Sequence, residues 1–487
     1  MLTHERPLSP AAPSAQPYPS RWVMLPVLLS ALFMAQFDLY VVNIAAPTLE
    51  HDLHAGPAAL ELIVAGYGFT YASGLITGGR LGDLLGSWKM FIAGTLAFGA
   101  ASLLCGLAQT SGELVAARLL QGLTGAAMVP QVLALISAVF PPAERSRALS
   151  WFGVTVGVGG VAGQILGGAL LQVNVLGLGW RVIFLVNVPI ALAAAALAHR
   201  LLPRLRSAAT PRLDLVGAAG ICLSLALVLV PLVLGRTEGW PLWAWASLAA
   251  AVPALVASLL WERALARRGG QPLLDLTLFT DTVFARGLLI CLGVFGAFFS
   301  LMFTLTLVLQ SGLGLDPLHA GLTFGPLGLA FAAASITSPR LVGRHGSRLV
   351  TAGTAVSGLG LIALLVVLHL TGADIQALHL IGPMVLIGLG NGLAVPALTG
   401  VVLGGVRAGN AGAASGLLTT SQQFASAAGI AALGAVFFQA LGTGHGPAAY
   451  TSALATVAVV DLALVALAML GSFLLTRSTR STREQPA

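Results

Sequence analysis

Long uncharged apolar runs constrain this chain more than any other feature of its sequence. The longest extends from Ala408 to Val460, 53 residues without Asp, Glu, Lys or Arg. Only 8% of the 487 residues are charged and 57% are hydrophobic, whereas a soluble protein carries about 25% charged residues. So few charges cannot cover a water-facing surface, and disordered chains have the opposite composition. The sequence therefore predicts an all-α polytopic membrane protein.

The apolar runs divide into fourteen candidate spans, each at least as long as the roughly 20 residues that a membrane helix needs. Charges, Gly/Pro turns and polar clusters separate them, and residues 442–447 divide the longest run in two. The predicted spans are 22–46, 58–79, 89–109, 113–138, 147–173, 181–201, 214–234, 240–261, 284–310, 317–338, 348–370, 377–404, 411–440 and 452–475.

The basic residues provide a test of this count. If the N-terminus is cytoplasmic, 21 of the 24 Lys and Arg residues fall on the cytoplasmic side. Arg181 and Arg236 fall outside, and Arg118 lies within a span. A wrong count would exchange the sides of every later loop and remove this asymmetry. The positive-inside rule thus favours fourteen helices with both termini cytoplasmic.

An internal repeat indicates how the helices are grouped. The Arg-Leu pair at 80–81 and the Gly-Ser pair at 86–87 recur 260 residues later, at 340–341 and 346–347. Two six-helix halves with two helices inserted between them would produce this spacing. The predicted divisions are a tail 1–21, a six-helix bundle 22–201, a linker 202–213, two inserted helices 214–262, a linker 263–283, a six-helix bundle 284–475 and a tail 476–487.

Several function classes are excluded by what the sequence lacks. The single lysine, Lys89, follows Trp88, so no phosphate-binding loop ending in Gly-Lys-Ser/Thr exists and ATP-driven pumping by this chain alone is excluded. No cysteine pair has metal spacing, and the three cysteines lie in apolar runs, so neither a metal nor a disulfide is expected. The thinly spread basic residues do not predict nucleic-acid binding. We find no cluster of His, Ser or acidic residues at one depth, as an intramembrane enzyme would require.

Four motifs occur in order along the chain. They are FDLYVVNIAAP at 37–47, GRLGDLLG at 79–86, RLLQG at 118–122 and WRVIFLVNVP at 180–189. Together they resemble the major facilitator superfamily, specifically its fourteen-helix drug:proton antiporter branch. This resemblance implies the 6+2+6 fold and a secondary exporter of drugs or antibiotics that uses a proton gradient and no cofactor. It also implies alternating access and function as a monomer, while the Arg-over-Lys bias suggests a bacterial cell membrane.

The fifth helix departs from the antiporter pattern. That pattern has Gly-Pro before a Gly-Gly pair, whereas this chain has Gly163-Gln164 before Gly167 and Gly168. Gln164 in place of proline leaves an alternative open: an exporter or facilitator of a metabolite without strict proton coupling.

Three charged residues within spans are candidates for proton coupling. Asp38 lies midway along the first span, where an acid costs about 2.5–3.5 kcal/mol and tends to take up a proton if it has no partner. Arg118 needs a counter-charge, and Asp38 is its candidate partner if the first and fourth helices pack together as the resemblance implies. The alternative is a fixed structural pair. Asp461, in the last span, is a second proton site, a substrate-recognition site or a structural hydrogen-bonding group.

Other polar residues are candidates for gating or for the substrate cavity. In the family the loop that carries Arg80, Asp83, Gly86 and Lys89 gates alternating access. The candidate cavity residues, which are alternatively ordinary interhelical partners, are Gln36, Tyr40, Asn43, Tyr67, Tyr71, Gln121, Gln310, Asn391, Gln422 and Gln423. Three of them, Gln36, Tyr40 and Asn43, share a face of the first helix that excludes Asp38.

Overall fold

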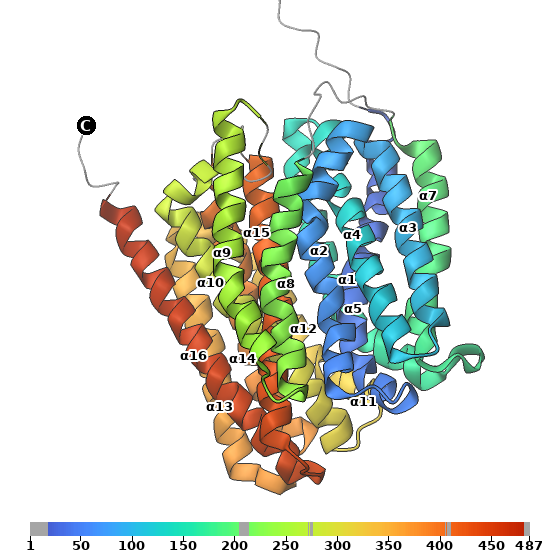
Figure 1. Cartoon of the computed structure of the whole chain (residues 1–487), viewed down its shortest axis with the longest axis vertical. Coiled ribbons are helices and arrows are strands. Elements are labelled where there is room, and N and C mark those ends of the chain that lie inside the picture. Colours follow the sequence, from blue (N-terminus) through green and yellow to red (C-terminus); the bar gives the residue numbers. More distant parts are fainter. Residues whose placement is uncertain are drawn as a thin grey trace, which may run out of the picture.

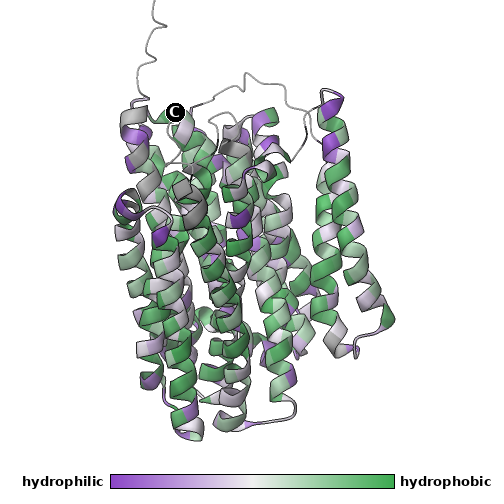
Figure 2. Cartoon of the chain, turned by 90° about the vertical axis from the view of Figure 1, so that its left-hand side faces the viewer, coloured by the Kyte–Doolittle hydropathy of each residue, from purple (hydrophilic) through white to green (hydrophobic). Residues whose placement is uncertain are grey.

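The computed structural model is all-helical and describes residues 18–203, 214–270, 272, 276–404, 406 and 411–481. Most of the predicted linker 202–213 and of the predicted tail 1–21 lies outside these residues, as do part of the linker 263–283 and the end of the tail 476–487. Figure 1 shows the first-half helices on one side of the molecule and the last-half helices on the other. Most of each helix is hydrophobic, and hydrophilic residues lie mainly toward the helix ends (Figure 2).

The first group of helices runs from Arg21 to Leu201. Its elements are α1 (Arg21–Asp52), α2 (Pro57–Leu85), α3 (Ser87–Leu107), α4 (Ser111–Val139), α5 (Pro142–Val173), the short helices η1 (Val175–Gly177) and η2 (Gly179–Arg181), α6 (Val182–Leu185) and α7 (Asn187–Leu201). The pair α8 (Leu215–Thr237) and α9 (Leu242–Arg267) follows.

The last group begins after this pair. Its elements are η3 (Leu276–Thr280), α10 (Thr282–Leu307), the π-helical turn η4 (Val308–Gly312), α11 (Pro317–Thr323), α12 (Gly325–His345), α13 (Arg348–Thr371), η5 (Gly372–Asp374), α14 (Ala377–Gly404), α15 (Ala411–Leu441) and α16 (Gly446–Ser481).

The described residues contain thirteen helices long and apolar enough to cross a membrane. A fourteenth is present if the two parts of α5, which meet at 40°, form one span. Two predicted spans are interrupted. Pro189 lacks the N–H that would bond to the carbonyl of Leu185, and α6 ends at Leu185. Pro326 likewise lacks an N–H, and α11 ends three residues before it, at Thr323. Both predicted spans, 181–201 and 317–338, are nevertheless present, as Gly179–Leu201 and Pro317–Ser338, and each contains a short interruption of its helix.

The two groups of helices meet along two main lines. Helix α2 contacts α15, and α5 contacts α11 and α12. The inserted helix α8 contacts both α2 and α15, so the extra pair lies beside the junction between the halves (Figure 1). The start of α1 lies next to the start of α5 and the end of α7, because Arg21 pairs with Glu144 and the Tyr18 hydroxyl donates to the Leu201 carbonyl.

Both repeated loops contain a glycine with positive φ, although its ψ differs, at 127° for Gly86 and −138° for Gly346. Gly86, between α2 and α3, has a φ of 93°, and Gly346, between α12 and α13, has a φ of 58°. Both values lie in the region that residues with a Cβ rarely adopt, so each tight turn requires its glycine. The repeat found in the sequence therefore corresponds to the same helix–turn–helix connection in both halves.

Candidate functional site

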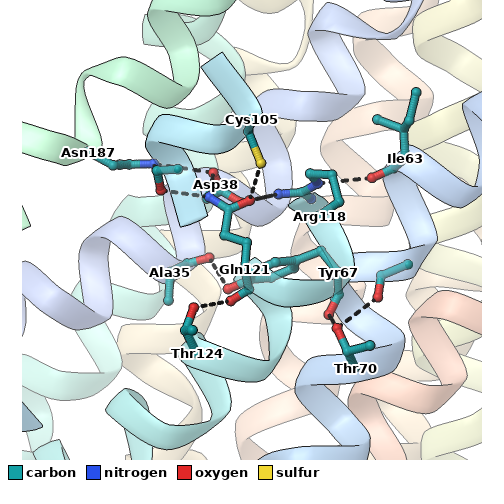
Figure 3. Close-up of polar contacts among 12 residues, drawn as sticks. Ala35, Asp38, Ile63, Tyr67, Thr70, Cys105, Arg118, Gln121, Thr124 and Asn187 are labelled. Carbon is teal, nitrogen blue, oxygen red and sulfur yellow. Dashed lines mark hydrogen bonds and ion pairs between the residues drawn. The ribbon is translucent and has the colours of Figure 1, made fainter. Parts of the chain in front are cut away.

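A buried ion pair joins the first and fourth helices. Asp38 of α1 and Arg118 of α4 are both 0% exposed, and Arg118 Nη1 donates to Asp38 Oδ2. The contact expected from the sequence is thus present, at the centre of the network drawn in Figure 3. Two opposite charges offset each other's burial only if further hydrogen bonds satisfy their remaining atoms.

Arg118 has additional partners within the same half. Its Nε donates to the carbonyl of Ile63, 3.0 Å away, and its Nη1 also donates to Gln121 Oε1 at 2.6 Å. The guanidinium lies 4.6 Å from the centre of the Tyr67 ring, a cation–π contact. Because these partners come from α2 and α4, the arginine would retain several of its contacts if Asp38 became neutral.

Asp38 also accepts from two amides. Gln121 Nε2 lies 2.9 Å from Asp38 Oδ1, and Asn187 Nδ2 lies 3.3 Å from the same atom. Ser102 of α3 accepts from both amides, at 2.8 and 3.4 Å. The network thus includes α1, α2, α3, α4 and α7 and is confined to the first half. Its chemistry is that of a buried acid whose ionised form is matched by a neighbouring cation.

Two members of this network were not singled out from the sequence. Ser102 and Asn187 are polar residues within apolar runs, and that was the only signal available for either. Asn187 is the first residue of α7, directly after the helix break that Pro189 imposes.

Several residues proposed as cavity lining lie inside the helical bundle. Gln121 belongs to the ion-pair network and is 0% exposed. The Tyr67 hydroxyl donates to the Ala35 carbonyl, and its ring stacks on Tyr71 with a centroid distance of 5.8 Å. Asn391 donates to Ser357 and therefore joins two helices of the last half.

Other candidates lie where the two halves meet. The Tyr40 ring of α1 lies 5.3 Å from the Phe299 ring of α10. Gln310 Nε2 donates to the Ile44 carbonyl at 2.7 Å, a hydrogen bond between the halves. Asn43 is fully buried, and neither of its amide atoms has a hydrogen-bond partner among the described residues.

The remaining amide candidates contact neighbouring helices. A Cβ on Gly159 of α5 would meet Gln36 Cβ at 2.7 Å. The backbone carbonyl of Gln423 faces Gly68 of α2, and the Gln422 side chain hydrogen-bonds the Cys291 thiol of α10.

The fifth-helix glycines have two different neighbours. A Cβ on Gly163 or Gly167 would collide with α1, at 2.8 Å from the Phe37 carbonyl and 2.5 Å from Val41 Cγ2 respectively. Gly168 faces the other half, because a Cβ there would lie 2.4 Å from the Pro317 carbonyl of α11. Gln164 is buried with both side-chain amide atoms unpartnered among the described residues.

Within the part of the chain that the structure describes, the candidate gating loop forms a hydrogen bond to a residue outside its own half. Arg80 Nη2 donates to the carbonyl of Pro272, in the segment that leads to the last group of helices, at 3.0 Å. Asp83 and Lys89 are exposed. Asp461 is 0% exposed and lies far along the chain from this loop, with the Ser300 hydroxyl 2.7 Å from its Oδ1.

Comparison with known proteins identifies the family. Residues 28–430 match the Major Facilitator Superfamily. The chain is 37% identical over 428 residues to a probable actinorhodin transporter of Streptomyces coelicolor, covering 88% of this chain and 74% of that protein. It is 34% identical over 450 residues to a cephamycin export protein of Amycolatopsis lactamdurans, covering 90% of each.

A solved structure has the same fold. A bacterial homologue of the human lysosomal transporter Spinster, in an inward-facing and unoccupied conformation, superposes with a TM-score of 0.70 at 17% identity. The superposition covers 97% of this chain and all of that one.

These helices and this buried charge network define a multi-pass membrane protein of the secondary-transporter class, not an enzyme. The chain belongs to the Major Facilitator Superfamily, and its relatives include antibiotic and drug export proteins of bacteria.

Proposed function

We propose that the protein exports small amphipathic molecules, antibiotics among them, across a bacterial cell membrane in exchange for protons. The observation that carries this proposal is the buried Asp38–Arg118 pair. The relatives described above are a cephamycin export protein and a probable actinorhodin transporter, and the proton step is argued from the chain's own residues.

The ion pair supplies a two-state element for proton coupling. Asp38 without a proton neutralises Arg118; Asp38 with a proton leaves the guanidinium charge to the Ile63 carbonyl, Gln121 and the Tyr67 ring. The two protonation states therefore favour different packing of α1 against α4. A proton moving inward gains about 2.3 kcal/mol per 100 mV of membrane potential and about 1.4 kcal/mol per unit of pH difference.

The orientation that we propose has both termini in the cytoplasm. The basic residues support it, since 21 of 24 then lie on the cytoplasmic side. We also propose that the halves 22–201 and 284–475 move against each other, with residues 214–262 as an accessory pair. Reporter fusions at Asp52 and at the C-terminus should give outside and inside signals respectively.

The test is export of a fluorescent cationic dye from bacteria that lack their own efflux pumps. Wild-type protein should lower dye accumulation, and a protonophore should abolish the effect. Asp38→Asn should also abolish it at equal expression. Asp52→Asn is the matched control, because Asp52 ends the same helix and is exposed. Export by Asp38→Asn at the wild-type rate would refute coupling through this carboxyl.

A second candidate function is export or facilitated movement of a metabolite without strict proton coupling. The observation in its favour is Gln164, which stands where the antiporter pattern has proline. Flux that is unaffected by the protonophore would select this alternative.

A further inference from the structure

The last half contains a second buried acid whose surroundings differ from those of Asp38. Asp461 of α16 is 0% exposed, and its Oδ1 lies 2.7 Å from the hydroxyl of Ser300 on α10, which is also fully buried. Its Oδ2 has no hydrogen-bond partner among the described residues. No described basic side chain forms an ion pair with it, whereas Asp38 is paired with Arg118.

The two acids occupy corresponding helix pairs. In the first half Asp38 lies on the first helix and accepts from Asn187 at the sixth span. In the last half the acid lies on the sixth span and its partner on the first, α10. Ser300 follows Asp38 by 262 residues, close to the 260-residue repeat. Each half therefore contains one carboxyl at the contact of its first and sixth spans.

Among the described residues of the helices packed against α16, no cation lies near Asp461. Helix α16 contacts α10, α13, α15, η4 and η5. Neither α15 nor η4 carries a charged side chain, and the charged or histidine residues of the other elements are Arg286, Arg348, His369 and Asp374.

All four lie far along the helices from the carboxyl. Arg286 is fourteen residues from Ser300, about 21 Å along α10 at 1.5 Å per residue. On α13, Gly358 faces Leu462, next to Asp461. Arg348 and His369 are ten and eleven residues from that glycine, about 15 Å or more away. Asp374 lies farther still and is itself acidic.

The Ser300 hydroxyl has two possible acceptors for its single proton, the Asp461 carboxyl and the Ala297 carbonyl. Its Oγ is 2.7 Å from Asp461 Oδ1 and 3.0 Å from the Ala297 carbonyl oxygen. A hydroxyl has one proton, and a carbonyl oxygen can only accept. If the Ser300 proton goes to Ala297, the proton in the shorter contact comes from the Asp461 carboxyl. An ionised carboxylate at this site would be buried without a counter-charge, at a cost of several kcal/mol.

We propose that Asp461 is a second proton-binding carboxyl, which holds a proton in this structure while Asp38 is ionised, so that each half carries one proton per transport cycle. Ser300 connects this carboxyl to the junction between the halves. Its neighbour Phe299 contacts Tyr40 of α1, and a movement of α1 against α10 therefore shifts the hydroxyl relative to Asp461. The coupling to transport, but not the proton-binding site itself, rests on the proposed function.

Infrared difference spectroscopy of the purified full-length protein in lipid tests the site without any substrate. Raising the pH from acid to alkaline should remove a protonated-carboxyl band that is absent in Asp461→Asn. Ser300→Ala should keep the band at a shifted frequency, because the carboxyl loses its hydrogen bond. Asp38→Asn should leave the band unchanged. A wild-type spectrum in which no band depends on Asp461, or in which that band does not respond to pH, would overturn the proposal.

The coupling is tested by the largest substrate gradient that reconstituted vesicles sustain at zero membrane potential. Each exchanged proton supports a tenfold gradient per pH unit. At a pH difference of one unit, exchange of two protons should let the wild-type protein sustain a substrate concentration ratio of about 100. Asp461→Asn should sustain a ratio of about 10 and bind the substrate with the same affinity. Equal gradients in both proteins would refute the coupling. Absence of any wild-type transport would instead refute the proposed function and leave the infrared result standing.

Discussion

Removing Asp38 and Arg118 one at a time should cost more stability in total than removing both residues together. Each side chain is 0% exposed, and loss of one partner from a buried pair typically costs about 3–5 kcal/mol because the other charge stays buried. Arg118→Met leaves Asp38 with only the Gln121 and Asn187 amides, at 2.9 and 3.3 Å. Asp38→Asn leaves Arg118 with the Ile63 carbonyl, the Gln121 oxygen and the Tyr67 ring.

The double variant Asp38→Asn/Arg118→Met contains neither charge. Its loss of stability should be smaller than the sum of the two single losses by about 2–3 kcal/mol, the upper part of the range for residues in direct contact. The measurement is reversible unfolding of the four proteins in detergent or bicelles, analysed as a double-mutant cycle. The double variant should remain inactive in export, because the proton-binding carboxyl is gone.

The reasoning fails if the single losses add within about 0.5 kcal/mol, the behaviour of independent sites. It also fails if either single variant is as stable as wild type. A matched cycle on the exposed pair His51–Asp52, at the end of the same helix, should give additive losses and thus sets the baseline.

Two further predictions concern the packing between helices. Gly168→Ala should lower the free energy of unfolding by about 1–3 kcal/mol, because its Cβ would lie 2.4 Å from the Pro317 carbonyl. Gly153→Ala is the control, because nothing lies within 4 Å of its new Cβ. In thermal melts the control should be as stable as wild type or more stable. Hydrogen bonds from Arg21 hold the pKa of Glu144 below its usual range. The pair therefore stabilises the folded protein at pH values above the ordinary glutamate pKa. This stabilisation is lost as the pH falls through the lower pKa that Glu144 has in the folded protein. Glu144→Gln should therefore lower the melting temperature at neutral pH. The melting temperature of this variant should also fall less than that of wild type when the pH is lowered. An equal fall in both proteins would contradict a stabilising role for the Arg21–Glu144 pair.

The helical membrane architecture could be predicted from the sequence, because the length of each apolar run and the side on which the basic residues fall are properties of whole spans. Neither property depends on how the helices pack. Asp38 was also the candidate partner of Arg118, because the family resemblance implied packing of the first helix against the fourth, and the structure contains this contact. The sequence did not predict that Asn187 and Ser102 complete the network. The rotation of each helix about its own axis decides which polar groups meet, and that rotation is fixed by packing between helices distant in sequence.

The helix breaks and the contact between the halves were also beyond sequence reasoning. Pro189 and Pro326 were visible as residues, but proline is tolerated in the first turn of a helix, so their presence did not decide between a continuous span and a break. Likewise the role of Gly168 depends on Pro317, 149 residues away. A smooth glycine face indicates close packing without identifying the helix that approaches it.

The ion pair also has a consequence for the order in which the chain is assembled. Asp38 is synthesised 80 residues before Arg118. At about 5–20 residues per second, the first helix waits roughly 4–16 seconds for its counter-charge. During that interval its carboxyl is either protonated in the lipid or kept at the aqueous insertion machinery. The first half therefore cannot complete its packing before the fourth span has left the ribosome. A pause in translation between these two helices prolongs the time during which α1 lacks its partner and is accessible to the proteases that degrade unassembled membrane proteins.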